Sequence, residues 1–233
     1  GLDLENNQAV LFEETVIDTA EAEELDTGND SPPASFIDKP GNFVLLLYHN
    51  DTNGSLPASS VTLDNARAIQ YESATLDNFN DDKVTDWEKF DFGSGNGFLK
   101  EEDGQFTIGM HQPPGQPFFV AATYESKTFT IEDGTTIEFS VDLIGANQPD
   151  SFAVLSFIPK DSPVSTLTGY SVAKDINDVL LAKGLNKYFY DITEGEWIDR
   201  EENIRLVLSM TGSGKSVEIT TRGLDLENNQ AVL

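Results

Sequence analysis

Apolar and polar residues alternate along most of this chain, in short segments bounded by glycine, asparagine, aspartate and proline. A period of two predicts β-strands that bury one face. The predicted strands are residues 8–18, 42–49, 59–71, 104–110, 117–124, 127–131, 135–144, 151–159, 168–175, 186–192, 203–210 and 216–226. A hint of helical spacing is confined to residues 175–185. The number and spacing of the strands favour one all-β domain, a two-sheet antiparallel sandwich.

The segments between the predicted strands have the composition of turns and loops. Residues 50–54 and 132–136 are rich in Gly, Asn and Asp and predict tight turns. The acidic, Ser- and Pro-rich residues 20–41 predict a long surface loop. Residues 211–215 and the serine after them end like a phosphate-binding loop, but position 209 is serine where that motif needs glycine. Because the segment leads into a strand rather than a helix, it predicts a hairpin turn.

Eleven residues occur twice, since the sequence GLDLENNQAVL of residues 1–11 returns unchanged at residues 223–233. Read across the second copy, the chain gives a strand, a polar turn and the start of another strand. This pattern predicts a β-hairpin that is divided between the two ends of the chain, with residues 216–226 paired to residues 8–18. The chain is then circularly permuted relative to a unit that contains the uninterrupted hairpin.

Two origins account for the duplication: an array of near-identical tandem repeats, or one domain rewired with overlapping ends. Of the two, the array is preferred. In either case one hairpin needs each strand once, so residues 1–7 and 227–233 are surplus strand ends. Surplus strand edges recruit partners, and self-association with a neighbouring molecule through these ends is expected.

Composition narrows the classes of partner. The chain has 41 Asp and Glu against 14 Lys and Arg, a formal charge of −27, which repels nucleic acid and anionic membrane surfaces. The acidity is typical of a solvated, salt-adapted or extracellular surface, with an array of cation sites as the alternative. No stretch reaches the roughly 18–20 apolar residues of a membrane span, so no membrane insertion is expected. The absence of cysteine excludes disulfides and thiolate chemistry.

Two stretches have the features of module edges. Residues 75–87 (TLDNFNDDKVTDW) look like an opening and residues 60–71 (SVTLDNARAIQY) like a closing strand. They resemble the ends of bacterial concanavalin A-like, laminin-G-like jelly-roll modules, which often begin with an Asp-aromatic-Asp segment before a Trp and end on V-T-x-D-N. The resemblance implies a jelly roll from a secreted or surface protein, with residues 74–222 as its front, 1–72 as its back and 223–233 as the repeat of 1–11.

The same two stretches predict a calcium site. Ca²⁺ prefers several oxygen ligands, often gathered by a loop. Donors of this kind are Asp77, Asn78, Asn80, Asp81 and Asp82, together with Asp64 and Asn65. In modules of the resembled type the first and last strands run side by side, which implies one structural Ca²⁺ with Asp77 and Asp64 as favoured ligands. The alternative is that these side chains form Asx turns and strand-end caps.

A polysaccharide partner requires aromatic side chains on an exposed face or loop rim. The candidate aromatic residues are Trp87, Trp197, Tyr170, Phe118 and Phe119. Of these, Trp87, Phe118 and Tyr170 are the predicted ligand-binding residues. The alternative for both tryptophans is that they close the ends of the sandwich core.

Catalytic patterns are weak, so a non-catalytic structural or carbohydrate-binding module is expected. Glu138 and Asp142 share a strand face but are about 13 Å apart by strand rise, too far for a glycosidase pair. Glu196 and Asp199 also lack the spacing of the laminarinase-like E-x-D-x-x-E pattern. The histidines, at positions 49 and 111, are interpreted as loop residues, and no G-x-S-x-G motif occurs. The alternative is a glycoside hydrolase or lyase on the same scaffold.

Overall fold

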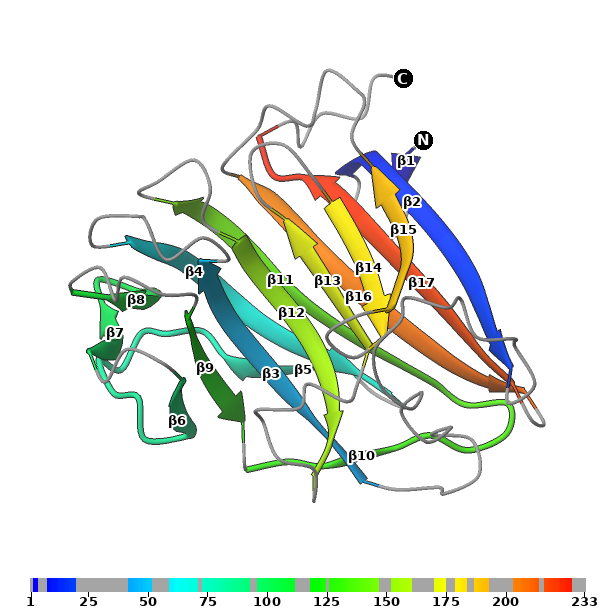
Figure 1. Cartoon of the computed structure of the whole chain (residues 1–233), viewed down its shortest axis with the longest axis horizontal. Helices are drawn as coiled ribbons and strands as arrows, with labels where there is room; N and C mark the ends of the chain where they lie inside the picture. The colour runs from blue at the N-terminus through cyan, green and yellow to red at the C-terminus, as the bar shows by residue number, and fades with distance from the viewer. Residues whose placement is uncertain are drawn as a thin grey trace.

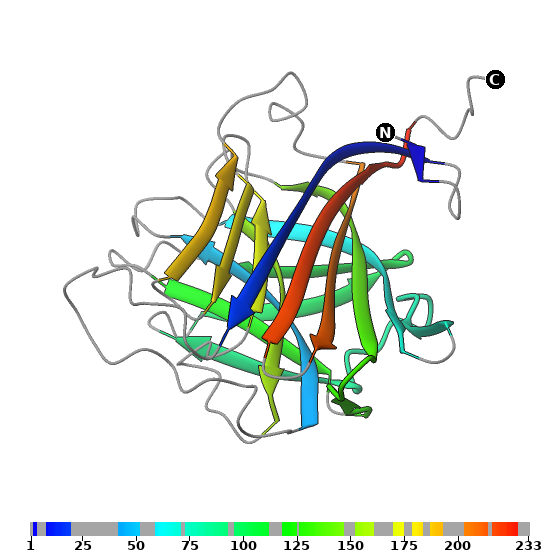
Figure 2. The same ribbon diagram turned by 90° about the vertical axis from the view of Figure 1, so that its right-hand side faces the viewer.

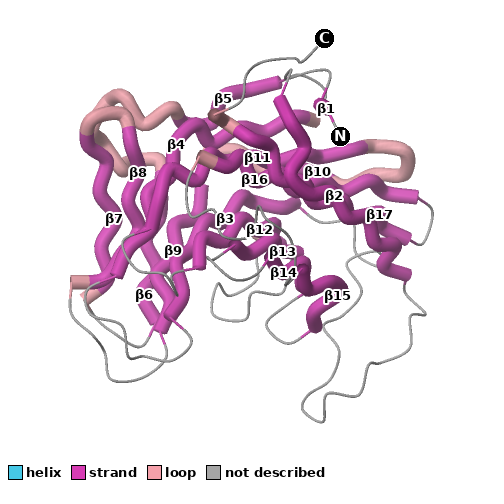
Figure 3. The backbone as a smooth tube through the Cα atoms, turned by 90° about the horizontal axis from the view of Figure 1, so that it is seen from above, coloured by secondary structure: helices cyan, strands magenta, loops and turns pink. Residues whose placement is uncertain are grey.

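The computed structural model describes the chain in fourteen ranges. The described residues are 2–3, 8–19, 42–51, 59–70, 73–92, 96–111, 118–124, 126–146, 152–160, 170–174, 179–183, 187–192, 203–213 and 216–227. Strands are the only regular secondary structure among them (Figure 3). The predicted all-β class with two antiparallel sheets is confirmed. None of these residues belongs to a helix long and apolar enough to cross a bilayer.

The first sheet has nine strands, all paired antiparallel (Figure 1). In spatial order they are β1 (Leu2–Asp3), β2 (Gln8–Thr19), β17 (Ser216–Asp225), β16 (Ile204–Ser213), β11 (Thr136–Ala146), β4 (Ser59–Ile69), β8 (Gln105–Met110) and β7 (Gly97–Glu102), with β5 (Ser73–Asp77) also paired to β4. The predicted strand over residues 59–71 therefore ends at Ile69, and the chain turns back along it as β5.

The second sheet has eight strands and faces the first (Figure 2). Its order is β15 (Lys187–Ile192), β14 (Val179–Lys183), β13 (Tyr170–Lys174), β12 (Phe152–Pro159), β3 (Asn42–Asp51), β9 (Phe118–Tyr124) and β6 (Trp87–Phe92), with β10 (Phe129–Thr130) paired to β3. The helical interpretation of residues 175–185 is wrong. Residues 179–183 form β14, because a short apolar run gains strand partners on both sides.

One hydrophobic core lies between the sheets. It is built from alternate residues of facing strands, as the period-two pattern requires. Its members include Leu45, Leu47, Val61, Leu63, Phe106, Ile108, Phe139, Val141, Leu155, Phe157, Leu206, Leu208 and Ile219. Each side chain in this set is at most 1% exposed. Strands of both sheets therefore contribute to a sandwich interior.

A second apolar cluster covers the outer face of the eight-stranded sheet. Its members are Val44, Leu46, Tyr48, Phe119, Ala121, Val154 and Ile158. The run of apolar residues 44–48 is thus buried on both faces of β3, which explains why this strand lacks alternation in the sequence.

The pairing predicted for the two ends of the chain is confirmed. β17 and β2, red and blue in Figure 2, form an antiparallel ladder from Ser216 opposite Thr19 to Leu224 opposite Val10. On its other edge β2 carries β1, in which Leu2 lies opposite Ala9. The first surplus end therefore folds back on its own chain.

The turn predicted over residues 132–136 is confirmed, and a hairpin forms where the second turn was predicted. Gly134 has a φ of 73°, and the N–H of Thr135 donates to the carbonyl of Glu132. Ser213 and Ser216 are cross-strand partners at the end of the β16–β17 hairpin, as the prediction of a turn between two strands requires. Residues 211–213 belong to β16, and residues 214–215 lie outside the described residues. The predicted loop of residues 20–41 and most of the turn near residue 52 lie outside the described residues.

Candidate functional site

Asp77 anchors the acidic loop that follows β5. Its Oδ1 accepts a hydrogen bond from the N–H of Phe79 at 2.8 Å, and its Oδ2 accepts one from Trp87 Nε1 at 2.8 Å. Trp87 is 5% exposed and packs against Phe106 and Tyr124, with ring centroids 5.1 Å away in each case. A loop carboxylate thus satisfies the polar atom of a core tryptophan, and Trp87 has the core position that was the alternative to ligand binding.

The exposed side chains of the loop form local turns. Asn78 Oδ1 accepts from the N–H of Asn80 at 3.3 Å, and Asp81 Oδ1 accepts from the N–H of Lys83 at 3.1 Å. Asp82 adopts a φ of 54°, a left-handed conformation that Asp tolerates. These are the Asx turns that stood as the alternative to calcium binding.

Glu101 joins this loop from β7, and the sequence analysis missed it. Its Oε1 accepts from the N–H of Asp81 at 3.1 Å, while its Oε2 is buried without a hydrogen-bond partner. Burial raises the pKa of Glu101, and the charges of Asp77 and then Asp81 add to the rise, while the backbone N–H groups of Asp81 and Lys83 oppose it. The available signal was a glutamate two residues after Leu99, on the inward-facing set of β7, but no strand was predicted over residues 97–102.

These acidic groups fit a cation in part. Glu101 is 7% exposed, and its Oε2 lies buried without a hydrogen-bond donor near the carboxylates of Asp77 and Asp81. A hard cation would neutralise this concentration of negative charge. Within the described ranges, however, no three His, Asp or Glu side chains are already arranged to hold a metal ion. Binding would therefore need side chains of this loop to turn toward Glu101.

Asp64, the fourth predicted ligand, lies on the other face of the sheet. Opposite residues in a ladder share a face. Asp77 is opposite the core residue Ala66, whereas Asp64 is opposite Asp142 on the outer face. A bulge at Asn65, which has a φ of 49°, causes this arrangement. Because of the bulge, two consecutive residues, Asp64 and Asn65, lie outside the core between the buried Leu63 and Ala66.

Asp64 belongs instead to an ionic cluster on the outer face of the nine-stranded sheet. Arg205 of β16 donates to Asp142 of β11 through Nε at 2.6 Å and Nη2 at 2.9 Å. Asn65 Nδ2 donates to the same carboxylate at 3.1 Å. Burial raises the pKa of Asp64, and the charge of Asp142 adds to the rise. The N–H of Asn65 and the charges of Arg67 and Arg205 oppose it.

Glu138, the other carboxylate considered for catalysis, is also held by an arginine. Arg222 of β17 reaches across β16 and donates through Nη2 to Glu138 Oε2 at 2.7 Å. Val207 lies opposite Arg222 on the intervening strand and is 2% exposed. Glu138 and Asp142 therefore do share the outer face, each in its own ion pair.

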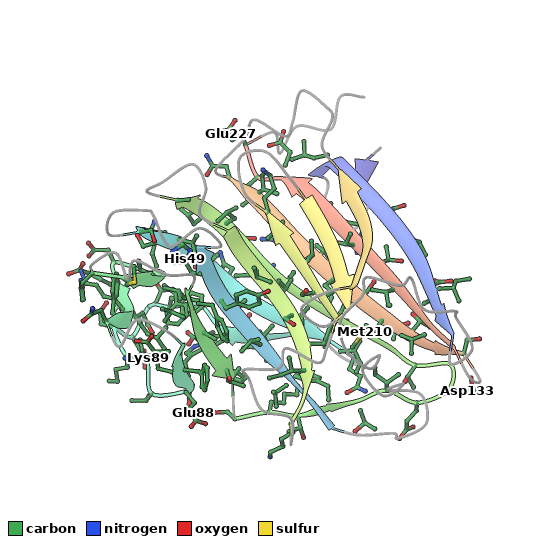
Figure 4. The ribbon with its side chains drawn as sticks, in the orientation of Figure 1. His49, Glu88, Lys89, Asp133, Met210 and Glu227 are labelled. Atoms are coloured by element: carbon green, nitrogen blue, oxygen red, sulfur yellow. The ribbon has the colours of Figure 1, made fainter. Side chains whose placement is uncertain are left out.

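The interpretation of His49 as a loop residue is wrong. It lies on β3, near the end of that strand in Figure 4, and is fully buried. His49 Nε2 and the hydroxyl of Ser59 on β4 are 2.8 Å apart, so this hydrogen bond joins the two sheets. His111, by contrast, is exposed after β8 and stacks on Phe98 at 4.3 Å. The burial of His49 depends on the opposite sheet, which the local pattern does not contain.

The remaining predicted ligand-binding residues lie far apart in the strand order. Phe118 begins β9 opposite Asp51, and Tyr170 begins β13 opposite Phe157, with β3 and β12 between the two strands. Trp197, Glu196 and Asp199 lie outside the described residues. Compared with protein-family models, curated proteins and solved structures, the chain gives no match.

Proposed function

We propose that this chain is a non-catalytic structural module, repeated in tandem in a secreted or surface protein of bacteria and folded as a jelly roll. The observation that carries the proposal is the ladder between β17 and β2. It unites the two ends of the chain in one sheet, and the strand β17 ends within the second copy of the duplicated sequence.

The ladder supports tandem repetition because it gives each repeat a complete sheet. Leu224 and Asp225 repeat Leu2 and Asp3 in sequence, so the residues that end one unit also begin the next. In an array the polar residues after Asp225 connect the closed sheet of one unit to β2 of its successor. Repetition thus needs no linker beyond the duplicated segment.

The outer-face ion pairs support a structural role over catalysis. A glycosidase needs one carboxyl group to donate a proton and another to act as base or nucleophile. Asp142 is bound by two nitrogens of Arg205, and Glu138 is bound by Arg222. Such pairing holds both groups as ordered, charged components of a sheet surface.

We further propose that the loop of residues 77–82 and Glu101 bind a structural cation, with Ca²⁺ as the ion of choice. Asp77, Asn78, Asp81 and Glu101 would supply its oxygen ligands, and the ion would neutralise carboxylates that otherwise repel one another. Support comes from the unpartnered Glu101 Oε2 and the raised pKa of that residue. An unchanged melting temperature after chelation and after addition of Ca²⁺ would remove this site.

A two-repeat chain tests the tandem proposal. Residues 1–222 followed directly by residues 1–233 should give twice the molar far-UV circular dichroism of the single chain and the same or a higher melting temperature. As a matched pair, Ile219→Asp in β17, at a fully buried position, should unfold the module, while Ile17→Asp in β2, at a position 61% exposed, should be tolerated. Aggregation of the two-repeat chain, or loss of half its signal, would contradict tandem folding.

A polysaccharide panel tests the non-catalytic assignment. The folded chain is incubated with neutral and acidic polysaccharides, and reducing ends, unsaturated uronates and retained binding are measured. We expect no turnover. Products that vanish in Glu138→Gln, whose ion pair is the more exposed one, would establish the alternative, a hydrolase or lyase, whereas binding without products would make the module a carbohydrate-binding one.

A further inference from the structure

We propose that β2 is an exchangeable strand, so that β17 of one copy of this chain accepts β2 of a second copy in place of its own. The inference deepens the proposed function and rests on its tandem interpretation for the order of copies along one polypeptide. The partner is a second copy of the same chain, and the interface is the edge of β17 that β2 covers.

The duplicated residues show two competing pairings within one structure. Leu2 lies opposite Ala9, in a local hairpin whose strands are joined by residues 4–7. Leu224, the same residue in the second copy, lies opposite Val10 through pairing between the far ends of the chain. The same short sequence therefore pairs with the start of β2 in two ways: as residues 2–3, which are close in the chain, and as part of β17, which is distant in the chain.

The two pairings exclude each other at a single β17. Leu224 already has Arg205 of β16 on one edge and Val10 of β2 on the other. In a chain that continues past residue 233, the next copy of β2 follows Asp225 after a short polar turn. To form the local hairpin seen at Leu2, it must displace the resident β2 from the edge of β17.

The local hairpin has the advantage of a short loop, because the entropy lost on closing a loop increases with loop length. The β2 already paired with β17 forms no better contacts through its first residues than the next copy would, since residues 8–11 and 230–233 are identical. A displaced β2 can pair with the β17 of another copy, whose edge has the same sequence.

One described face of β2 lies in solvent, because Glu13, Thr15 and Ile17 are exposed. Leu11 packs, partly buried, against the core. The strand pairs with β17 along a ladder that includes a hydrogen bond between the hydroxyls of Thr15 and Thr220, 2.9 Å apart. An exchanged β2 would form the same ladder on the β17 of a second copy.

Cysteine pairing tests the exchange, because the chain has no cysteine of its own. Thr15 and Thr220 are direct cross-strand partners, and opposite residues in an antiparallel pair lie within disulfide reach. A chain with Thr15→Cys and one with Thr220→Cys, of different mass, are unfolded together, refolded at several concentrations and oxidised. We expect a covalent heterodimer whose share rises with concentration.

The matched control uses a strand pair that exchange leaves intact. Thr136 of β11 and Thr211 of β16 are also direct partners, with hydroxyls 2.8 Å apart. A mixture of Thr136→Cys and Thr211→Cys chains should give no heterodimer above background. Equal heterodimer in both mixtures, or none from Thr15→Cys with Thr220→Cys at any concentration, would overturn the exchange. Crosslinking of Thr15→Cys with itself would instead indicate edge addition of β2 to β2 and would also overturn it.

One further variant separates this inference from the proposed function. A chain with both Thr15→Cys and Thr220→Cys, oxidised at low concentration, should form the disulfide within one molecule. If it does while the mixed chains fail to crosslink, the closed module stands and only the exchange is lost. If it does not, the ladder on which both proposals rest is absent.

Discussion

The ion pair between Asp142 and Arg205, on the outer face of the nine-stranded sheet, is both nearly buried and bidentate. Its side chains are only 5% and 10% exposed, and both carboxylate oxygens accept from the guanidinium. Charged groups removed from water are costly unless every partner is present. The pair therefore couples β11 to β16 strongly while making each partner dependent on the other.

Removal of Asp142 alone should be severe. Asp142→Ala leaves Arg205 buried without its counter-charge, and we expect the free energy of unfolding to fall by about 3–5 kcal/mol. Urea denaturation followed by circular dichroism measures it. The double variant Asp142→Ala with Arg205→Met should recover part of the loss, because no unpaired charge remains.

As a control, Glu138→Ala breaks a more exposed pair and should cost about 0.2–1 kcal/mol. Similar losses for Asp142→Ala and Glu138→Ala would show that burial does not increase the contribution of the Asp142–Arg205 pair to stability.

Glu101 should make stability depend on pH. Its pKa is higher in the folded chain than the ordinary value of 4.5, so the unfolded chain loses this proton first as pH rises. The contribution of Glu101 is therefore fully present below about pH 4.5 and is lost as pH rises through the folded-state pKa. Glu101→Gln should match the parent at low pH and have a higher melting temperature at pH 7 without Ca²⁺.

Calcium should reverse the order of the melting temperatures of the parent chain and Glu101→Gln at pH 7. Bound Ca²⁺ would stabilise the ionised Glu101, so millimolar CaCl₂ should raise the melting temperature of the parent and change Glu101→Gln much less. Glu102→Gln, at the exposed neighbouring position, is the matched control and should follow the parent throughout. An equal response of all three chains to Ca²⁺ would place any bound ion elsewhere.

Among the strands, β3 and β4 are joined across the sandwich by a polar contact inside an apolar core. Ser59 and His49 are fully buried, and their side chains form a hydrogen bond at 2.8 Å. Ser59→Ala takes away one hydrogen-bond partner of the imidazole, and the expected loss is about 1–3 kcal/mol of unfolding free energy. Chemical denaturation gives the value. Ser60→Ala, at the next, half-buried position, is the control, and a larger loss there would argue against the inter-sheet role.

The sequence predicted elements best where burial follows a simple alternation. Residues 136–146 show it clearly, since Ile137, Phe139, Val141 and Leu143 face the core. The pattern does not predict β5, β6 and β7, because polar residues interrupt their alternation. It suggests a helix at β14, because that apolar run is too short to set a period. The pairing of β17 with β2 could be predicted only because the duplication revealed which strands are neighbours.

The candidate site was less predictable, because it depends on contacts between distant segments. The bulge at Asn65 turns Asp64 away from Asp77, and a single residue inserted in a strand leaves no periodic signal. Glu101 reaches the loop from a different strand, at a position where the pattern would lead one to expect an apolar residue. Loop composition identified the acidic segment, and tertiary packing decided which carboxylates meet.

The molecule as a whole has a formal charge of −27, and this charge should respond to salt. Repulsion among like charges destabilises a compact state, and 1 M salt shortens the screening length from about 10 Å at 0.1 M to about 3 Å. We expect the melting temperature to rise with NaCl and then level off. Differential scanning calorimetry at constant pH measures it, with KCl as a control for specific sodium binding. A melting temperature that falls with NaCl would show that the ion pairs outweigh the repulsion.

The antiparallel course of β2 and β17 also sets how the module would yield under tension. Val10 and Leu224 lie at the same end of the ladder and nearest the two points at which the chain would be pulled. Force applied along a tandem array would break the hydrogen bonds between β2 and β17 one after another. It would not load all of them in shear at the same time. In the tandem arrangement that we propose, β2 would therefore separate from β17 at low force while the other strands remain paired.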